Sequence, residues 1–117
     1  MALAQSSQPA VTIVDDGSGR ASVEVPLGRE FELDLGANPT TGYTWRCDLA
    51  SSGRVRLKSR DFQPSASGPP LRVGAGGTER FVFEAAAAGA ERVHFEYRRG
   101  QAGQPARTYD LTVTVLP

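Results

Sequence analysis

The chain has 117 residues and a mass of 12.5 kDa, enough for one domain and too short for two separate cores. Its 13 basic residues balance 13 acidic ones, which argues against a non-specific nucleic-acid binder and against a polybasic membrane-surface protein. The single cysteine and single histidine exclude an intramolecular disulfide and zinc sites built from several cysteines or histidines.

Residues 1–9 are interpreted as a disordered tail before a folded domain at 10–117. The triplet Ala2-Leu3-Ala4 fits the A-x-A pattern that precedes signal cleavage, although no charged segment or apolar core of a leader is present. The tail therefore favours the remnant of a signal-cleavage region and a periplasmic or secreted protein. The start of a cytoplasmic protein is the alternative.

Alternation of apolar and polar residues predicts about eight β-strands along the domain, and no segment has convincing helical periodicity. The apolar sets, in chain order, are Val11 and Ile13; Val23 and Val25; Phe31, Leu33 and Leu35; Tyr43, Trp45, Cys47 and Leu49; Val55 and Leu57; Phe81, Phe83 and Ala85; Val93, Phe95 and Tyr97; Tyr109, Leu111, Val113 and Val115. One apolar face per strand is typical of antiparallel sheets packed face to face. We predict an all-β, immunoglobulin-like antiparallel β-sandwich, with a small barrel as the alternative.

Strand order also predicts which loops lie together. If each strand crosses the full height of the sandwich, successive connections alternate between its two ends. The loops at 36–42, 61–77 and 99–106 then share one end, and those at 50–53 and 86–90 share the other. Binding residues gather on loops carried by a rigid scaffold, so we expect function at the first end.

The first of these loops reads Asn38-Pro39-Thr40-Thr41-Gly42. Proline fixes its own φ, glycine permits positive φ, and the two β-branched threonines are stiff. We expect a rigid turn that presents two hydroxyl groups. On this chemistry alone, an ordinary Asn-Pro/Gly turn between two strands is the favoured interpretation.

The second loop ends in the run Gly74, Ala75, Gly76 and Gly77. A phosphate-binding loop would need a following Gly-Lys-Ser/Thr and a helix, and here a strand follows. Glycines allow another chain's backbone to approach closely, which suits a protein contact; a flexible linker is the alternative. The third loop is locally basic, with Arg98, Arg99 and Arg107, and its alternative interpretation is a solvated hairpin loop.

These runs resemble the signature of the chagasin family of cysteine-protease inhibitors. The first element is the run from Asn38 to Tyr43 with Trp45 after it, and the second is Gly74–Gly77 before an aromatic strand. The third family element is Arg-Pro-Trp, of which Arg99 keeps the arginine while Gly100 and Gln101 replace the proline and tryptophan. The resemblance extends over about residues 10–116.

The resemblance implies an immunoglobulin-like sandwich whose three loops form a wedge that reversibly occludes the active-site cleft of papain-like cysteine proteases. The protease-binding residues that it implies are Asn38, Pro39, Thr40, Thr41, Gly42, Gly74, Ala75, Gly76, Gly77 and Arg99. Thr40 and Thr41 would lie closest to the catalytic groups of the protease. No residue of this chain would react, so we expect a monomeric inhibitor without cofactor or metal, and not an enzyme. The missing Pro-Trp pair predicts weaker binding or a different target preference.

The alternative function is a non-inhibitory immunoglobulin-like module for adhesion or assembly in the cell envelope. Catalysis is the least favoured. Cys47 shares the apolar face of its strand with Trp45, which predicts a buried, inert thiol. His94 is out of phase with its apolar neighbours and is expected to face solvent, so the two do not suggest a catalytic pair.

Overall fold

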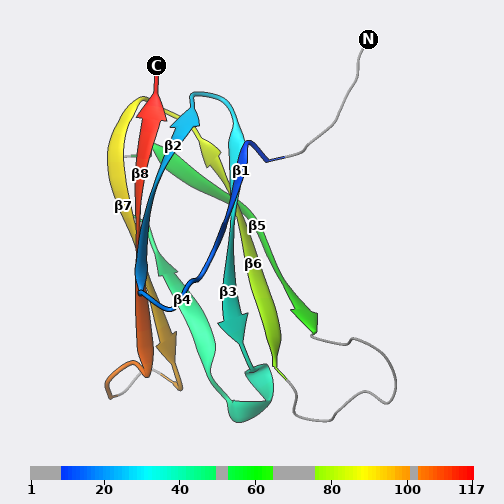
Figure 1. Ribbon diagram of the computed structural model, residues 1–117. Coiled ribbons are helices and arrows are strands. Elements are labelled where there is room, and N and C mark those ends of the chain that lie inside the picture. Colours follow the sequence, from blue (N-terminus) through cyan, green and yellow to red (C-terminus); the bar gives the residue numbers. More distant parts are fainter. Residues whose placement is uncertain (1–8, 50–52, 65–75, 101–102) are drawn as a thin grey trace.

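The computed structural model describes residues 9–49, 53–64, 76–100 and 103–117. Its elements, in chain order, are β1 (Val11–Val14), β2 (Arg20–Pro26), β3 (Glu30–Ala37), the short 3₁₀ helix η1 (Pro39–Thr41), β4 (Thr44–Asp48), β5 (Val55–Pro64), β6 (Gly77–Ala85), β7 (Gly89–Arg98) and β8 (Arg107–Leu116). The strands form two sheets that pack face to face, sheet A in the order β1-β3-β6-β5 and sheet B in the order β2-β8-β7-β4 (Figure 1). The predicted all-β sandwich is confirmed, and the barrel is not.

Strand direction alternates along the chain, as the loop argument assumed. The pairs β3–β6, β5–β6, β4–β7 and β7–β8 are antiparallel, whereas β1–β3 and β2–β8 are parallel. When every strand crosses the sandwich, strands an even number of places apart in the chain run the same way. The two N-terminal strands therefore add parallel edges to an otherwise antiparallel fold, a detail that the alternation pattern did not predict.

The two inner faces share one core. Its buried hydrophobic residues are Val25, Phe31, Leu33, Leu35, Trp45, Val55, Phe81, Phe83, Ala85, Val93, Phe95, Tyr97, Tyr109, Leu111, Val113 and Val115. Phe31 stacks on Phe83 within sheet A at a centroid distance of 5.3 Å, and Phe81 meets Phe95 of sheet B edge-on at 5.1 Å. Each large buried side chain stabilises the fold by roughly 1.5–3 kcal/mol, so the core is a firm base for the loops.

Strand β5 departs from its predicted alternation. Its pairing with β6 shifts register between Leu57 and Ser59, which inserts one extra residue and reverses the faces beyond it. Arg60 consequently lies over the ring of buried Phe81, 4.8 Å from its centroid. The Arg60 Nη2 also donates to the carbonyl oxygen of Trp45 at 2.9 Å, which joins the open edges of the two sheets.

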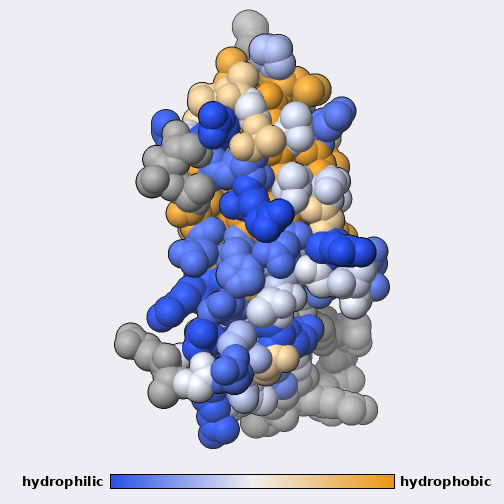
Figure 2. All heavy atoms as spheres, turned by 90° about the vertical axis from the view of Figure 1, so that its left-hand side faces the viewer, coloured by the Kyte–Doolittle hydropathy of each residue, from blue (hydrophilic) through white to orange (hydrophobic). Residues whose placement is uncertain are grey.

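The ends of β3, β5 and β7 and the starts of β4, β6 and β8 lie at one end of the sandwich, opposite the C-terminus (Figure 1). This arrangement confirms that the connections after β3, β5 and β7 share an end. The outer side of sheet B is hydrophilic over its middle and over the half that leads to these connections, and more hydrophobic toward the C-terminal end (Figure 2).

Candidate functional site

The first loop is a single 3₁₀ turn organised by Asn38. The Asn38 Oδ1 accepts hydrogen bonds from the Thr40 N–H at 3.2 Å and from the Thr40 hydroxyl at 2.6 Å. The Asn38 carbonyl oxygen accepts from the Thr41 N–H at 3.2 Å and from the Thr41 hydroxyl at 2.7 Å. Gly42 ends the turn with a φ of +86°, which glycine adopts without strain. The turn is therefore rigid because of these bonds as well as its stiff residues.

The two threonines are exposed at the tip, but their hydroxyl groups differ from the expectation. Both hydroxyl hydrogens point back to Asn38, and the Thr41 oxygen also accepts from the Tyr43 N–H at 3.5 Å. A binding partner would therefore meet methyl groups and hydroxyl lone pairs at this tip. Such a surface can accept hydrogen bonds and pack against apolar groups without first breaking the turn.

Tyr97 of β7 supports the first loop from within the sandwich. Its side chain is almost fully buried, with 8% exposed, and its hydroxyl oxygen accepts a hydrogen bond from the Asn38 N–H at 2.7 Å. Its ring stacks on Tyr43 with centroids 5.3 Å apart and lies 4.9 Å from that of Trp45. The alternation pattern placed Tyr97 in the core but gave no sign that its hydroxyl holds the loop.

Arg107, at the start of β8, packs against the same aromatic side chains, Trp45 and Tyr97. Its guanidinium carbon lies 5.2 Å from the Trp45 ring centroid and 4.8 Å from that of Tyr97. Its Nη2 donates to the Gly36 carbonyl oxygen at 2.7 Å, which also accepts from the Trp45 Nε1 at 2.9 Å. Arg107 thus ties the end of β3 to sheet B.

The glycines at the start of β6 lie beside the first loop. Gly77 pairs with Ala37 on one side and with Pro64 on the other. A Cβ on Gly77 would lie 2.2 Å from the Gln63 carbonyl oxygen, and one on Gly76 would lie 3.0 Å from the Ala37 carbonyl oxygen. The close approach that needs these glycines is therefore made by this chain's own strands, rather than by another chain as expected. Gly74 and Ala75 lie outside the described residues.

Arg99 brings the third loop against the first. A Cβ on Gly42 would lie 3.6 Å from the Arg99 Nε and 3.8 Å from its Cγ, so the Arg99 side chain lies beside the turn at Gly42. The Arg99 guanidinium carbon is 5.9 Å from the ring centroid of Tyr43. Arg99 and Gly100 are exposed, and Gln101 lies outside the described residues.

The described part of the chain thus brings residues of all three predicted loops together. Gly76 and Tyr97 lie beside Asn38, and Arg99 lies beside Gly42 of the same turn. The residues predicted for the site that the structure places at this end are Asn38, Pro39, Thr40, Thr41, Gly42, Gly76, Gly77 and Arg99. Tyr97 and Arg107, which are far from the first loop in sequence, support it by hydrogen bonds to Asn38 and Gly36.

Cys47 and His94 do not form a catalytic pair. Cys47 pairs with inward-facing Phe95 in the β4–β7 ladder, so its side chain lies on the face opposite to that of His94. Cys47 is half-buried rather than fully buried because β4 is an edge strand, and this burial raises the pKa of its thiol to about 11. The thiol therefore stays protonated and unreactive at neutral pH.

No group of three or more His, Cys, Asp or Glu side chains in the described ranges is arranged to hold a metal ion. Within the same ranges, no helix has the length and apolar character that crossing a bilayer requires.

Comparisons with known proteins agree with this arrangement. A sequence model of the group described as Chagasin family peptidase inhibitor I42 matches residues 24–113. Chagasin of Trypanosoma cruzi is 31% identical over 98 residues, which cover 80% of this chain and 86% of the relative.

Solved structures also share the fold. The cysteine protease inhibitor EhICP2 from Entamoeba histolytica has a TM-score of 0.75 and 16% identity, over 93% of this chain and 100% of that one. PbICP-C, solved in complex with falcipain-2, has a TM-score of 0.57 and 20% identity, over 97% and 96%.

The family match spans β3 to β7, the end of β2 and most of β8, and so includes all three loops of the site. The resemblance seen in the sequence is therefore confirmed, and the chain belongs to the chagasin family of peptidase inhibitors.

Proposed function

We propose that the chain is a reversible protein inhibitor of papain-like cysteine proteases, and that it occludes their active-site cleft with the three-loop end of the sandwich. The observation that carries this proposal is that described residues of all three loops come together. Gly76 lies beside Asn38, and Arg99 lies beside Gly42. A wedge assembled before binding loses little conformational entropy when it enters a cleft.

The first loop is suited to the centre of the wedge because a protease cannot readily use it as a substrate. Proteases cleave segments that extend along the cleft, whereas this turn is closed by bonds to both Asn38 oxygens. The exposed Thr40 and Thr41 side chains form its tip. Inhibition then needs no chemical step from this chain, which agrees with the neutral thiol of Cys47.

Titration of papain with the protein, followed with a fluorogenic substrate, tests the proposal. We expect inhibition at or below micromolar concentrations, and loss of inhibition in Thr41→Glu without loss of folding. Thr12→Glu is the matched control, because Thr12 is also an exposed threonine and lies on β1, outside the site. Wild-type protein without effect on papain and on a cathepsin L-like enzyme would contradict the proposal and favour a non-inhibitory adhesion module.

A further inference from the structure

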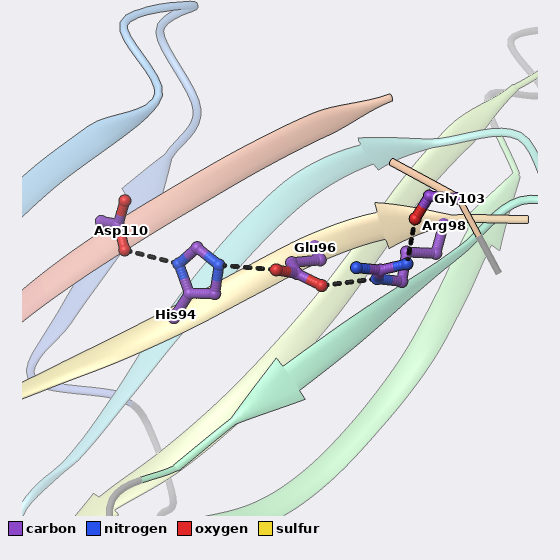
Figure 3. Close-up of polar contacts among 5 residues, drawn as sticks. All are labelled: His94, Glu96, Arg98, Gly103 and Asp110. Atoms are coloured by element: carbon purple, nitrogen blue, oxygen red, sulfur yellow. Dashed lines mark hydrogen bonds and ion pairs between the residues drawn. The ribbon is translucent and has the colours of Figure 1, made fainter. Parts of the chain in front are cut away.

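A line of polar side chains crosses the outer face of sheet B and ends in the third loop (Figure 3). It starts at Asp110 of β8, whose Oδ1 lies 2.7 Å from the His94 Nδ1. The His94 Nε2 lies 3.1 Å from the Glu96 Oε2. The Arg98 Nε donates to the Glu96 Oε1 at 2.5 Å, and the Arg98 Nη1 donates to the Gly103 carbonyl oxygen at 2.8 Å.

The last contact in this line spans the third loop. The stem of the loop closes where the Ala106 N–H donates to the Tyr97 carbonyl oxygen at 2.9 Å. Beyond the stem, Arg98 reaches from the end of β7 to Gly103 on the returning side. Arg99, which packs against the first loop, follows Arg98 directly. Arg98 therefore holds the third loop at a point directly next to Arg99, the residue that lies beside the first loop.

The two contacts of His94 require its protonated form. Both ring nitrogens face carboxylate oxygens, which accept hydrogen bonds and do not donate when ionised. A neutral imidazole carries one N–H and can satisfy one of the two carboxylates, whereas the imidazolium satisfies both. The hydrogen bond with Asp110 is the largest cause that raises the pKa of His94, and Glu96 adds to it against the opposing effect of burial.

The charged groups around His94 also favour the imidazolium. Asp110 faces it from β8, Asp48 is its pairing partner on β4, and Glu96 follows on β7 itself. Four arginines are also nearby. Arg20 of β2 pairs with Asp110 and Arg46 of β4 pairs with Glu96, while Arg92 and Arg98 lie on the same face of β7 as His94. No carboxylate contact to Arg20, Arg46 or Arg92 is found in the described ranges, whereas His94 contacts two carboxylates directly.

We propose that Arg98 is a positioning residue for the third loop of the protease-binding end, and that protonated His94 keeps Arg98 in place by holding Glu96. The proposal rests on the proposed function. When His94 loses its proton and keeps the shorter contact with Asp110, the Nε2 lone pair faces Glu96 and repels it. Glu96 then holds Arg98 less firmly, and Arg98 releases Gly103. Inhibition should therefore be strongest at acidic pH and weaken as His94 deprotonates.

The first test needs no protease. The Gln104 amide shares a peptide plane with the Gly103 carbonyl, so its ¹⁵N chemical shift reports the bond from Arg98. Between pH 5 and 8.5 we expect this shift to titrate with the midpoint of the His94 ring in the wild type, and not to titrate in Arg98→Gln. A Gln104 shift that ignores His94, or that titrates equally in Arg98→Gln, would overturn the proposal.

The second test measures inhibition constants against papain at pH 5 and pH 8. Loss of one or two such hydrogen bonds predicts that the wild-type constant rises about three- to tenfold more than that of His94→Gln. Arg98→Gln should have the shallow profile of His94→Gln, and the double variant should match Arg98→Gln. Arg92→Gln is the control, because it removes an exposed arginine of the same strand and face but should keep the wild-type profile.

The outcomes separate the two proposals. A wild-type pH profile in Arg98→Gln would show that the charge of His94 acts directly on the protease, and would overturn the positioning role. Absence of inhibition by the wild type at both pH values would overturn the proposed function. The Gln104 titration would still decide whether His94 and Arg98 hold the loop.

Discussion

The first and third loops reach the same end of the sandwich by different means. In the first, the Asn38 oxygens accept four hydrogen bonds from the next turn of chain, so the bonds that shape the loop are mostly local, and the Tyr97 hydroxyl adds one from β7. In the third, the hold on Gly103 comes from Arg98 and, through Glu96, from His94 on the sheet face. A loop held by short local bonds should be insensitive to distant changes, whereas one held by long side chains should respond to them.

The largest expected effect concerns the second loop, whose described end lies directly against the backbone of a neighbouring strand. Gly77→Ala would place a Cβ against the backbone of both Gln63 and Pro64, so we expect a loss of about 3 kcal/mol in the free energy of unfolding. Gly36→Ala is the control, since nothing lies within 4 Å of a Cβ there. Urea unfolding measures both, and equal stability of the two variants would contradict the packing argument.

The next largest expected effect is a change in the inhibition constant caused by a substitution in the third loop. Gln101→Trp restores the aromatic residue of the family element, and an interface tryptophan contributes on the order of 2 kcal/mol or more to binding. We expect a correspondingly lower inhibition constant against papain. Gln104→Trp, in the same loop, controls for a general gain from an added indole. An unchanged constant in Gln101→Trp would remove the third loop from the interface.

Tyr97→Phe tests whether the first loop is as self-sufficient as its local bonds suggest. The substitution keeps the stacking on Tyr43 and Trp45 but removes the hydroxyl that accepts from the Asn38 N–H, which should cost about 1 kcal/mol of stability. We expect the inhibition constant to rise less than fivefold, since the bonds within the turn remain. Tyr43→Phe is the control, because its hydroxyl has no partner among the described residues. A much larger loss of inhibition in Tyr97→Phe would show that the turn depends on Tyr97.

The same contrast explains how far the sequence could predict the molecule. Alternation predicted the faces of β3, β7 and β8, and strand parity predicted which loops share an end, because both depend on local periodicity. The extra residue between Leu57 and Ser59 in β5 could not be predicted, since nothing in the local pattern marks a bulge. The position of Arg60 over the ring of Phe81 follows from this bulge and could not be predicted either.

At the site, the sequence identified the exposed turn but not its supports. Asn38 was expected as a turn residue, and its role as the shared acceptor follows from the same local segment. The bond between Tyr97 and Asn38 joins residues 59 apart, and that between Arg107 and Gly36 joins residues 71 apart. Such contacts depend on the packing of the two sheets, which periodicity does not specify. From the sequence, Arg107 is identified only as a basic residue of the third loop.

The smallest expected effect is the pH dependence of stability, and it tests whether the third loop depends on the sheet face. The pKa of His94 is raised above 6.5 in the folded chain, chiefly by its hydrogen bond with Asp110, so the folded state binds the proton more tightly than the unfolded state. The resulting stability is fully present below pH 6.5 and is lost as pH rises through the raised pKa. The lowered pKa of Glu96 acts at the opposite, acidic end, where its contribution is lost as pH falls.

Urea unfolding of the wild type and His94→Gln between pH 5 and 8.5 isolates the histidine. His94 is partly exposed, so solvent screening limits the expected difference to about 0.5 kcal/mol at pH 5, and it should vanish at pH 8.5. A constant difference across this range would exclude the proton of His94 as its source. If His94 both stabilises the fold and positions Arg98, inhibition should weaken over the same pH range in which the stability contribution of His94 is lost. Inhibition that weakens only outside that range would assign the two effects to different groups.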